Sequence, residues 1–187
     1  MSGLTFLSAV SMAEQIRKKK ISPVELVEAH LAQIEKLNPR LNAFVQVNGE
    51  RARRSAQDAE SAVREKAQKN SLGPLHGVPI TIKSSISVAG LRCEAGSRLR
   101  AGFVARQDAP LVARLKSAGA IILGMTNTPE LLMAWETDNL LYGPTNNPWD
   151  LERTPGGSSG GEAAAIAAGM SAGGVGSDCL LYTSRCV

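Results

Sequence analysis

The sequence predicts an α/β fold in which a largely parallel sheet is flanked by helices. Two runs rich in β-branched residues, Val78–Ile82 and Ala120–Leu123, have the length and composition of buried strands. Between them, Asp108-Ala-Pro110 is predicted to cap a helix that continues to Ala118. A strand, a helix and a second strand in this order imply a parallel pairing. The helix residues predicted to face inward are Leu111, Val112 and Leu115.

The N-terminal part is predicted to be helical. An amphipathic first helix covers the apolar stretch Leu4–Ala13 and ends near the basic run 17–20. Ser22-Pro-Val-Glu25 has the capping-box pattern with proline in the first turn, which predicts a helix to about Leu37. Arg51–Lys69 contains neither Gly nor Pro and predicts a second, charged helix. We expect both to cover the outside of the domain, and Lys69–Pro74 to form the turn into the first strand. The apolar residues assigned to the first helix are Leu7, Val10, Met12 and Ile16.

Composition fits a soluble domain. The chain has 187 residues, of which 43% are apolar and 20% charged, so a single core is possible. The net charge of +4 is mild, and basic residues alternate with acidic ones, which is typical of solvated helix faces. Aromatic residues make up 4%, which argues against a nucleic-acid partner that stacks its bases. No transmembrane segment is visible and no positive charge precedes Leu4–Ala13, so we expect a cytoplasmic protein without a membrane partner.

The segment Thr154–Gly169 carries the chemistry. Its glycines bracket Ser158 and Ser159 directly before an alanine-rich helix, so two hydroxyls lie on a turn at a helix N-terminus. A phosphate-binding loop would need a lysine where Glu162 stands. A nucleophile elbow would need an apolar strand before the turn and a histidine after it. The chain's two histidines, His30 and His76, both precede the turn.

A third use of such a turn is a serine whose proton leaves through a lysine. Lys83 follows the predicted strand Val78–Ile82, and a lysine that emerges from a buried strand is desolvated. Desolvation lowers the pKa of the amine, which can then act as a neutral base near pH 7. An ordinary strand-end lysine in solvent is the simpler interpretation, and spacing alone favours it.

Several blocks in order resemble the amidase signature family. They are the turn Gly156-Gly-Ser-Ser-Gly-Gly-Glu162, the Lys83 strand, Ala120–Asn127 and Tyr142–Asp150. The resemblance runs from near residue 8 to Asp178, less than half of a typical member. It implies an amidase-signature-type sheet that is incomplete in this chain, with residues 1–178 forming the N-terminal part of a single amidase domain.

The resemblance also implies roles. In this family a Ser-cisSer-Lys triad hydrolyses the carbon–nitrogen bond of linear carboxylic amides through a serine acyl-enzyme, with no metal or cofactor. Lys83 would be the terminal base, and Ser158 the bridging serine after a cis peptide bond. Ser159 would either steady Lys83 or cap the helix. The residues expected to shape the turn and position a small-molecule amide are Gly156, Gly157, Ser159 and Gly160.

Within the family, the alternative to a general amidase is the A subunit of glutamyl-tRNA(Gln) amidotransferase. That subunit usually resembles GGSSGGSAAA, whereas Glu162 and the segment Glu130–Asn139 look more like general amidases. In this region Thr128-Pro-Glu130 is predicted to open a short helix. Its apolar residues Leu131, Leu132 and Met133 are assigned to the core.

The chain departs from the family pattern after Asp178. Tyr182 stands at the position of the nucleophilic serine, and leucines replace the two glycines that shape the oxyanion hole. Ser184 is displaced by two residues, so we do not assign it the role. A back-translation of residues 179–187 resembles two transposon ends used in sequencing libraries, joined head to head. We therefore expect an aberrant, non-native tail on an N-terminal fragment, and a third possibility is a non-catalytic truncated product.

Overall fold

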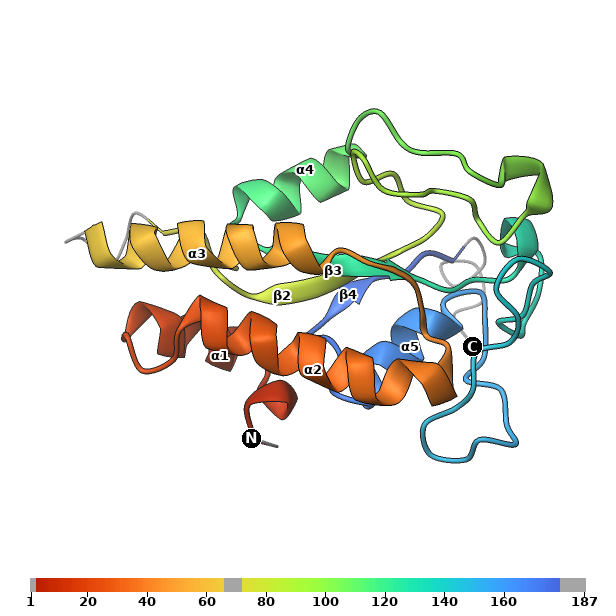
Figure 1. The fold of residues 1–187 in the computed structure, drawn as a ribbon, viewed down its shortest axis with the longest axis horizontal. Helices are drawn as coiled ribbons and strands as arrows, with labels where there is room; N and C mark the ends of the chain where they lie inside the picture. The colour runs from red at the N-terminus through yellow and green to blue at the C-terminus, as the bar shows by residue number, and fades with distance from the viewer. Residues whose placement is uncertain (1–2, 66–71, 179–187) are drawn as a thin grey trace, which may run out of the picture.

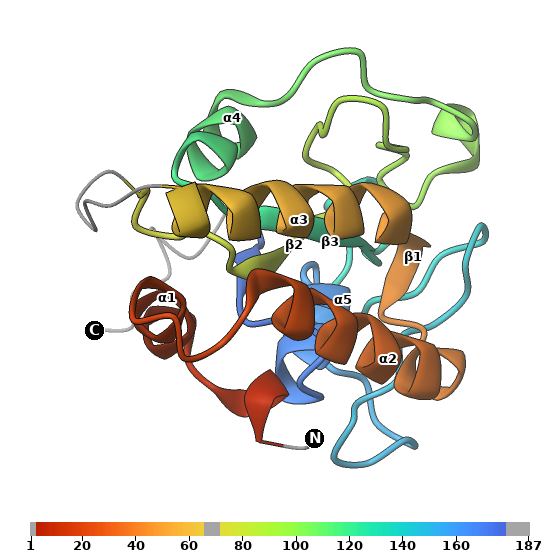
Figure 2. The same ribbon diagram turned by 60° about the vertical axis from the view of Figure 1, so that its left-hand side comes forward.

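The computed structural model describes residues 3–65 and 72–178, and its centre is a mixed, mostly parallel sheet. The four strands are β1 (Phe44–Val47), β2 (Pro79–Lys83), β3 (Ile121–Thr126) and β4 (Gly174–Val175). They lie in the order β1-β3-β2-β4; Figure 1 labels β2, β3 and β4, and Figure 2 labels β1. β2 runs parallel to both neighbours, and β1 runs antiparallel to β3. The predicted fold class is therefore confirmed.

The strand–helix–strand unit consists of β2, α4 (Pro110–Ser117) and β3, and its two strands pair in parallel as predicted. Every residue of both strands is buried, which explains their nearly continuous apolar runs. Each strand extends beyond the predicted end. Lys83 is therefore the last residue of β2, and its partner in the ladder is Thr126 at the end of β3.

Two details predicted for α4 are wrong. Leu111 is 38% exposed, because Val112 occupies the buried position on this short helix. Asp108 does not cap the helix, whose N-cap residue is Ala109. The Asp108 carboxylate instead accepts hydrogen bonds from the Ala89 backbone N–H and from the Lys116 ammonium.

The first helix, α1 (Ala9–Arg17), begins later than predicted because Ser8 caps it by accepting a hydrogen bond from the Ser11 backbone N–H. Met12 and Ile16 are buried on it as expected. Val10 is 69% exposed, so its assignment to the apolar face is wrong.

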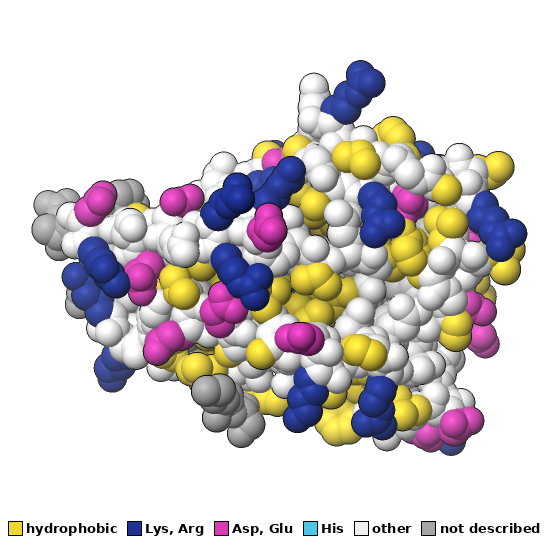
Figure 3. All heavy atoms as spheres, in the orientation of Figure 1, with side chains coloured by type: hydrophobic (Ala, Val, Ile, Leu, Met, Phe, Trp, Pro, Cys, Tyr) yellow, Lys and Arg dark blue, Asp and Glu magenta, His cyan; other side chains and the backbone are white. Residues whose placement is uncertain are grey.

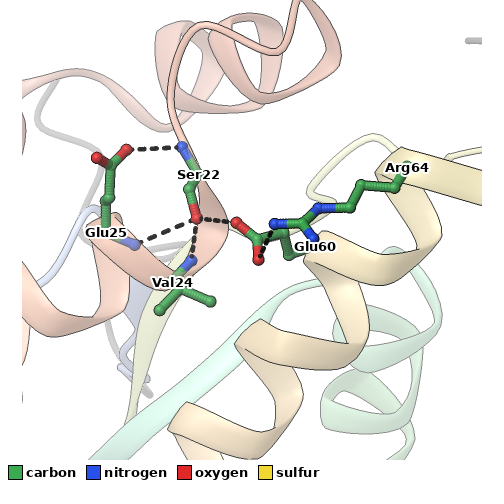
Figure 4. A network of polar contacts seen from close by, with 5 residues as sticks. All are labelled: Ser22, Val24, Glu25, Glu60 and Arg64. Atoms are coloured by element: carbon green, nitrogen blue, oxygen red, sulfur yellow. Dashed lines mark hydrogen bonds and ion pairs between the residues drawn. The ribbon is translucent and has the colours of Figure 1, made fainter.

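The second helix, α2 (Pro23–Leu41), has the predicted capping box. Figure 4 shows that the Ser22 hydroxyl accepts from the backbone N–H groups of Val24 and Glu25, while the Glu25 carboxylate accepts from the Ser22 N–H. The same hydroxyl donates to Glu60 on α3 (Gly49–Glu65) at 2.6 Å. One serine therefore both begins α2 and joins it to α3. The predicted continuation of α3 to Lys69 and the start of the turn 69–74 lie outside the described residues.

α2 and α3 run side by side and cover the sheet (Figures 1 and 2). Alanines recur on the inner face of α3 at helical spacing, so its backbone can approach β3 closely. Apolar side chains are visible between the two helices, and charges of both signs line their outer faces (Figure 3). The cluster they form with the sheet includes Val27, Ile34, Ala56, Leu123 and Ala165. A second cluster joins α1, β2 and α4 through Ile16, Ile82 and Val112.

The chain between β3 and α5 (Gly160–Ala167) is mostly irregular. The predicted short helix is a single 3₁₀ turn, Glu130–Leu132, and its apolar residues are not core. Leu131 is 45% exposed and Met133 is 86% exposed. They are exposed because this turn lies beyond the end of β3, in the irregular part of the chain that leads to α5.

Candidate active site

The Lys83 side chain is fully buried at the end of β2, although its amine needs polar partners. The Nζ atom lies 2.7 Å from the Ser158 Oγ atom and 2.9 Å from the Ser159 Oγ atom. The Ser177 carbonyl oxygen lies 3.1 Å away. The strand-end lysine is thus not in solvent, and its amine meets both serines of the turn.

The two serines have different surroundings. The Ser159 hydroxyl donates to the Ser177 carbonyl and accepts from the Ser177 backbone N–H, both at 3.2 Å. Ser159 is the N-cap residue of α5, yet its side chain makes no capping hydrogen bond. The Ser158 backbone carbonyl accepts from the Thr128 hydroxyl at 2.7 Å. The peptide bond between Gly157 and Ser158 is cis, the geometry that the resemblance implies.

The glycines of the turn meet specific requirements of space and conformation. Gly156 has a φ of 86°, which side-chain-bearing residues rarely adopt. A Cβ atom on Gly157 would lie 2.8 Å from the Trp135 backbone carbonyl carbon. The Thr137 hydroxyl joins the ends of the turn, because it donates to the Gly156 carbonyl and accepts from the Gly160 N–H.

A buried amide network fixes the loops that hold these threonines. The Asn139 side-chain NH₂ donates to the Asn127 side-chain oxygen at 2.7 Å and to the Thr128 carbonyl at 2.8 Å. The Asn127 NH₂ donates in turn to the Thr145 hydroxyl at 3.0 Å. Residues of the blocks 120–127 and 142–150, which carry part of the family resemblance, therefore help to hold the loops next to the serine turn.

Glu162 is a site residue that sequence reasoning did not place. Its carboxylate is buried and accepts hydrogen bonds from the hydroxyls of Thr81 on β2 and Thr126 on β3. Burial raises the pKa of Glu162 to about 7, while the two hydroxyls and the Lys83 charge act in the opposite direction. The sequence did hold one signal for this role, because Glu162 is the single charged residue within the apolar run Gly160–Gly169.

Two hollows open onto Ser158. One, of about 490 Å³, lies along the serine turn and reaches Asp178. The other, of about 470 Å³, is walled by residues 131–135 and includes Ser177. Met133 and Trp135, which are more than 80% exposed, lie on its apolar side. A small molecule with an apolar part could therefore reach the Ser158 hydroxyl. The tail positions predicted to replace the nucleophile and its glycines, residues 180–182, lie outside the described residues, as does Ser184.

In the described ranges 3–65 and 72–178, no three His, Cys, Asp or Glu side chains are grouped so as to hold a metal ion. Within the same ranges, none of the helices has the length and apolar character to cross a membrane.

Comparison with known proteins connects this geometry to a family. A family model described as Amidase matches residues 25–179. An indoleacetamide hydrolase of Bradyrhizobium diazoefficiens is 47% identical over 163 residues, which is 87% of this chain and 30% of that protein. The A subunit of the glutamyl-tRNA(Gln) amidotransferase of Carboxydothermus hydrogenoformans is 42% identical over 175 residues, or 94% of this chain and 36% of that protein.

A solved structure of a fatty acid amide hydrolase superimposes with a TM-score of 0.89 at 28% identity, covering 95% of this chain and 31% of that chain. The chain thus spans about a third of the length of the relatives it matches.

Proposed function

Because the chain belongs to the amidase family, we propose that it supplies the base and the bridging serine of an enzyme that hydrolyses small carboxylic amides. Lys83 is the base and Ser158 is the bridge. The observation that carries this proposal is the 2.7 Å contact between the Lys83 Nζ atom and the Ser158 Oγ atom.

The hydrogen bonds around Lys83 join its amine to both serines of the turn and to the Ser177 carbonyl. Ser159 donates its one hydroxyl hydrogen to the Ser177 carbonyl, so it can only accept from Lys83. The Ser177 carbonyl is also an acceptor. An ammonium would donate to all three oxygens; we infer that in the resting state the amine is neutral, with its hydrogens directed to these two acceptors and its lone pair to the Ser158 hydroxyl. Ser158 can therefore donate its proton to Lys83.

The chemistry then follows the order of proton transfers. Lys83 takes a proton from Ser158, which takes one from a nucleophilic serine as that serine attacks the amide carbonyl. An acyl-enzyme forms, and the proton returns through Ser158 to the leaving amine or ammonia. Water then releases the acid by the same relay. Backbone N–H groups beside the nucleophile would hold the oxyanion.

We further propose that the 187-residue chain does not itself turn over amides. Residues 1–178 are the N-terminal part of one amidase domain, and Tyr182 stands where the family has its nucleophile. Purified chain and its Lys83→Ala variant should therefore release the same background amount of ammonia from a panel of primary amides. Turnover that is lost in Lys83→Ala would refute the proposed inactivity of this chain.

The relay itself is tested in the uninterrupted protein. Re-sequencing the locus from a library made without transposons gives the reading frame after Asp178, and recovery of the same nine codons would show that the tail is natural. In a protein with the family nucleophile, Lys83→Ala and Ser158→Ala should each lower kcat by at least about 100-fold. An exposed serine such as Ser61 supplies the control, Ser61→Ala, which should leave kcat unchanged. Full activity of either relay variant would refute the proposed function.

The A subunit of a glutamyl-tRNA(Gln) amidotransferase is a second candidate, favoured by the 42% identical relative. Such a protein needs partner subunits, so their genes beside the locus and co-purification with their products would favour it. Glutamyl-tRNA-independent hydrolysis of simple amides by the uninterrupted protein alone would favour the first candidate.

A further inference from the structure

Glu162 occupies an unusual position in the first turn of α5. Ser159 and Glu162 have the Ser-x-x-Glu spacing of a capping box, in which each side chain satisfies a backbone N–H of the other residue. Neither does so here, because Ser159 meets Lys83 and Glu162 accepts from the sheet. Both side chains therefore bind residues at or near the ends of β2 and β3 in place of the backbone N–H groups of their own helix.

The sheet brings the Glu162 carboxylate close to Lys83. Thr81 lies two residues before Lys83 and therefore on the same face of β2, and its hydroxyl donates to Glu162. Thr126, which donates to the other carboxylate oxygen at 2.6 Å, is the partner of Lys83 in the β2–β3 ladder. Glu162 is 4% exposed and Lys83 is fully buried, so little solvent lies between them to screen their charges.

Lys83 is the charged group that acts on Glu162. β3 and β4, which also pack against α5, carry no titratable side chain, and β2 carries only Lys83. Within α5, Glu162 is the only charged residue. Asp178 lies beside Ser177 in the hollow in front of the serine turn. A change of charge at Glu162 should therefore alter the proton affinity of the Lys83 amine more than that of any other group on these elements.

We propose that Glu162 is a positioning residue that sets the proton affinity of Lys83. The inference rests on the proposed role of Lys83 as the base. When Lys83 receives a proton through Ser158, the nearby carboxylate offsets the new ammonium charge. When the proton passes to the leaving amine, Lys83 is neutral again and Glu162 is unchanged. Thr81 and Thr126 hold the carboxylate in place during this cycle, in which Lys83 gains and loses the proton and Glu162 does neither.

The test is an NMR titration of the 187-residue chain that needs no activity. The ¹³Cε resonance of Lys83 in lysine-labelled protein is assigned with Lys83→Arg and followed against pH. Glu162→Gln should lower the pKa of Lys83 by about one unit or more, because a buried opposite charge is lost. Glu152→Gln, which removes an exposed carboxylate, should leave that pKa unchanged.

Thr126→Val provides a second test should Glu162→Gln fold poorly. It keeps the carboxylate but removes one hydrogen bond to its charged form, so the pKa of Glu162, read from its ¹³Cδ resonance, should rise. Thr126→Ser, which keeps the hydroxyl, should restore the wild-type titration. A Lys83 pKa that is the same in wild type and Glu162→Gln would overturn the inference, while the kcat loss in Lys83→Ala separately decides the proposed function.

Discussion

The Lys83 Nζ atom and the Ser158 Oγ atom lie 2.7 Å apart although 75 residues separate them in the chain. Two independent features bring them together. β2 ends at Lys83, beside the end of β3, and Thr128, which follows β3, donates to the Ser158 carbonyl. Thr137 joins the two ends of the serine turn. The contact therefore belongs to the tertiary fold and is lost when the fold is lost.

Burial should protect the Lys83 amine from reagents in the folded chain. An amine-reactive ester should modify exposed lysines such as Lys36 rapidly and leave Lys83 unmodified until the protein is unfolded. Peptide mass spectrometry of native and urea-unfolded samples measures both rates. Equal rates for Lys83 and Lys36 in the native sample would contradict the buried position.

Glu162 should make stability fall as pH rises. Its folded-state pKa is raised from 4.5 to about 7, so the folded chain binds more protons than the unfolded chain between these values. The free energy of unfolding should therefore decrease across this window, by about 3 kcal/mol at most. Glu162→Gln cannot ionise and should flatten the dependence in urea titrations from pH 4.5 to 7.5. A slope that persists in this variant would assign the effect to another group.

Loss of the Ser22 hydroxyl should destabilise the junction of α2 and α3. Ser22→Ala removes the cap and the hydrogen bond to Glu60, so the free energy of unfolding should fall by about 1–2 kcal/mol. Ser61→Ala, on the exposed surface of α3, is the matched control and should change it by less than about 0.5 kcal/mol. Urea denaturation followed by circular dichroism gives both values, and equal effects would refute the double role of Ser22.

Leu123 should be among the costly core positions. Leu123 lies on β3 and is fully buried in the cluster with residues of α2, α3 and α5. Leu123→Ala leaves a cavity there and should lower the free energy of unfolding by about 2–5 kcal/mol. Leu99 is 88% exposed, and Leu99→Ala should cost less than about 0.5 kcal/mol. Urea denaturation of Leu123→Ala and Leu99→Ala measures both changes, and equal small changes would contradict the close packing around Leu123.

The phenol of Tyr142 should ionise at a higher pH than an ordinary tyrosine. Burial, together with its hydrogen bond to the Glu94 carboxylate, raises the pKa of Tyr142 to about 12. The sequence has two tyrosines, so absorbance at about 295 nm should show a phenol that ionises near pH 12 and disappears in Tyr142→Phe. A midpoint near pH 10 for both tyrosines, the usual value, would contradict the contact of Tyr142 with Glu94.

Local patterns predicted the elements whose signals are local. The capping box at Ser22, the β-branched run before Lys83 and the glycines around the serines each specify a conformation within a few residues. The antiparallel strand β1 was not predicted, since it is four residues long and its pairing with β3 contains a bulge. The exposure of Met133 was missed for a different reason, because apolar character alone does not distinguish a core from the wall of a hollow.

The candidate site shows the same division. Lys83 and the two serines could be selected from their chemistry and their order in the chain, with help from the family resemblance. Glu162 could not be placed, because its partners Thr81 and Thr126 come from two strands whose register is a property of the whole sheet. The amides of Asn127 and Asn139 were missed for the same reason, since they act through buried hydrogen bonds between distant loops.

The close approach of Gly157 to the backbone around Trp135 has a consequence for redesign. The loop that walls the apolar hollow and the turn that carries Ser158 are in direct backbone contact, so they must move as one body. Side chains at Leu131, Met133 and Trp135 can be diversified to accommodate new ligands, because they are exposed and line the hollow that Ser158 also lines. Insertions or deletions in the same loop would instead displace the serine, so libraries of fixed loop length are the productive choice.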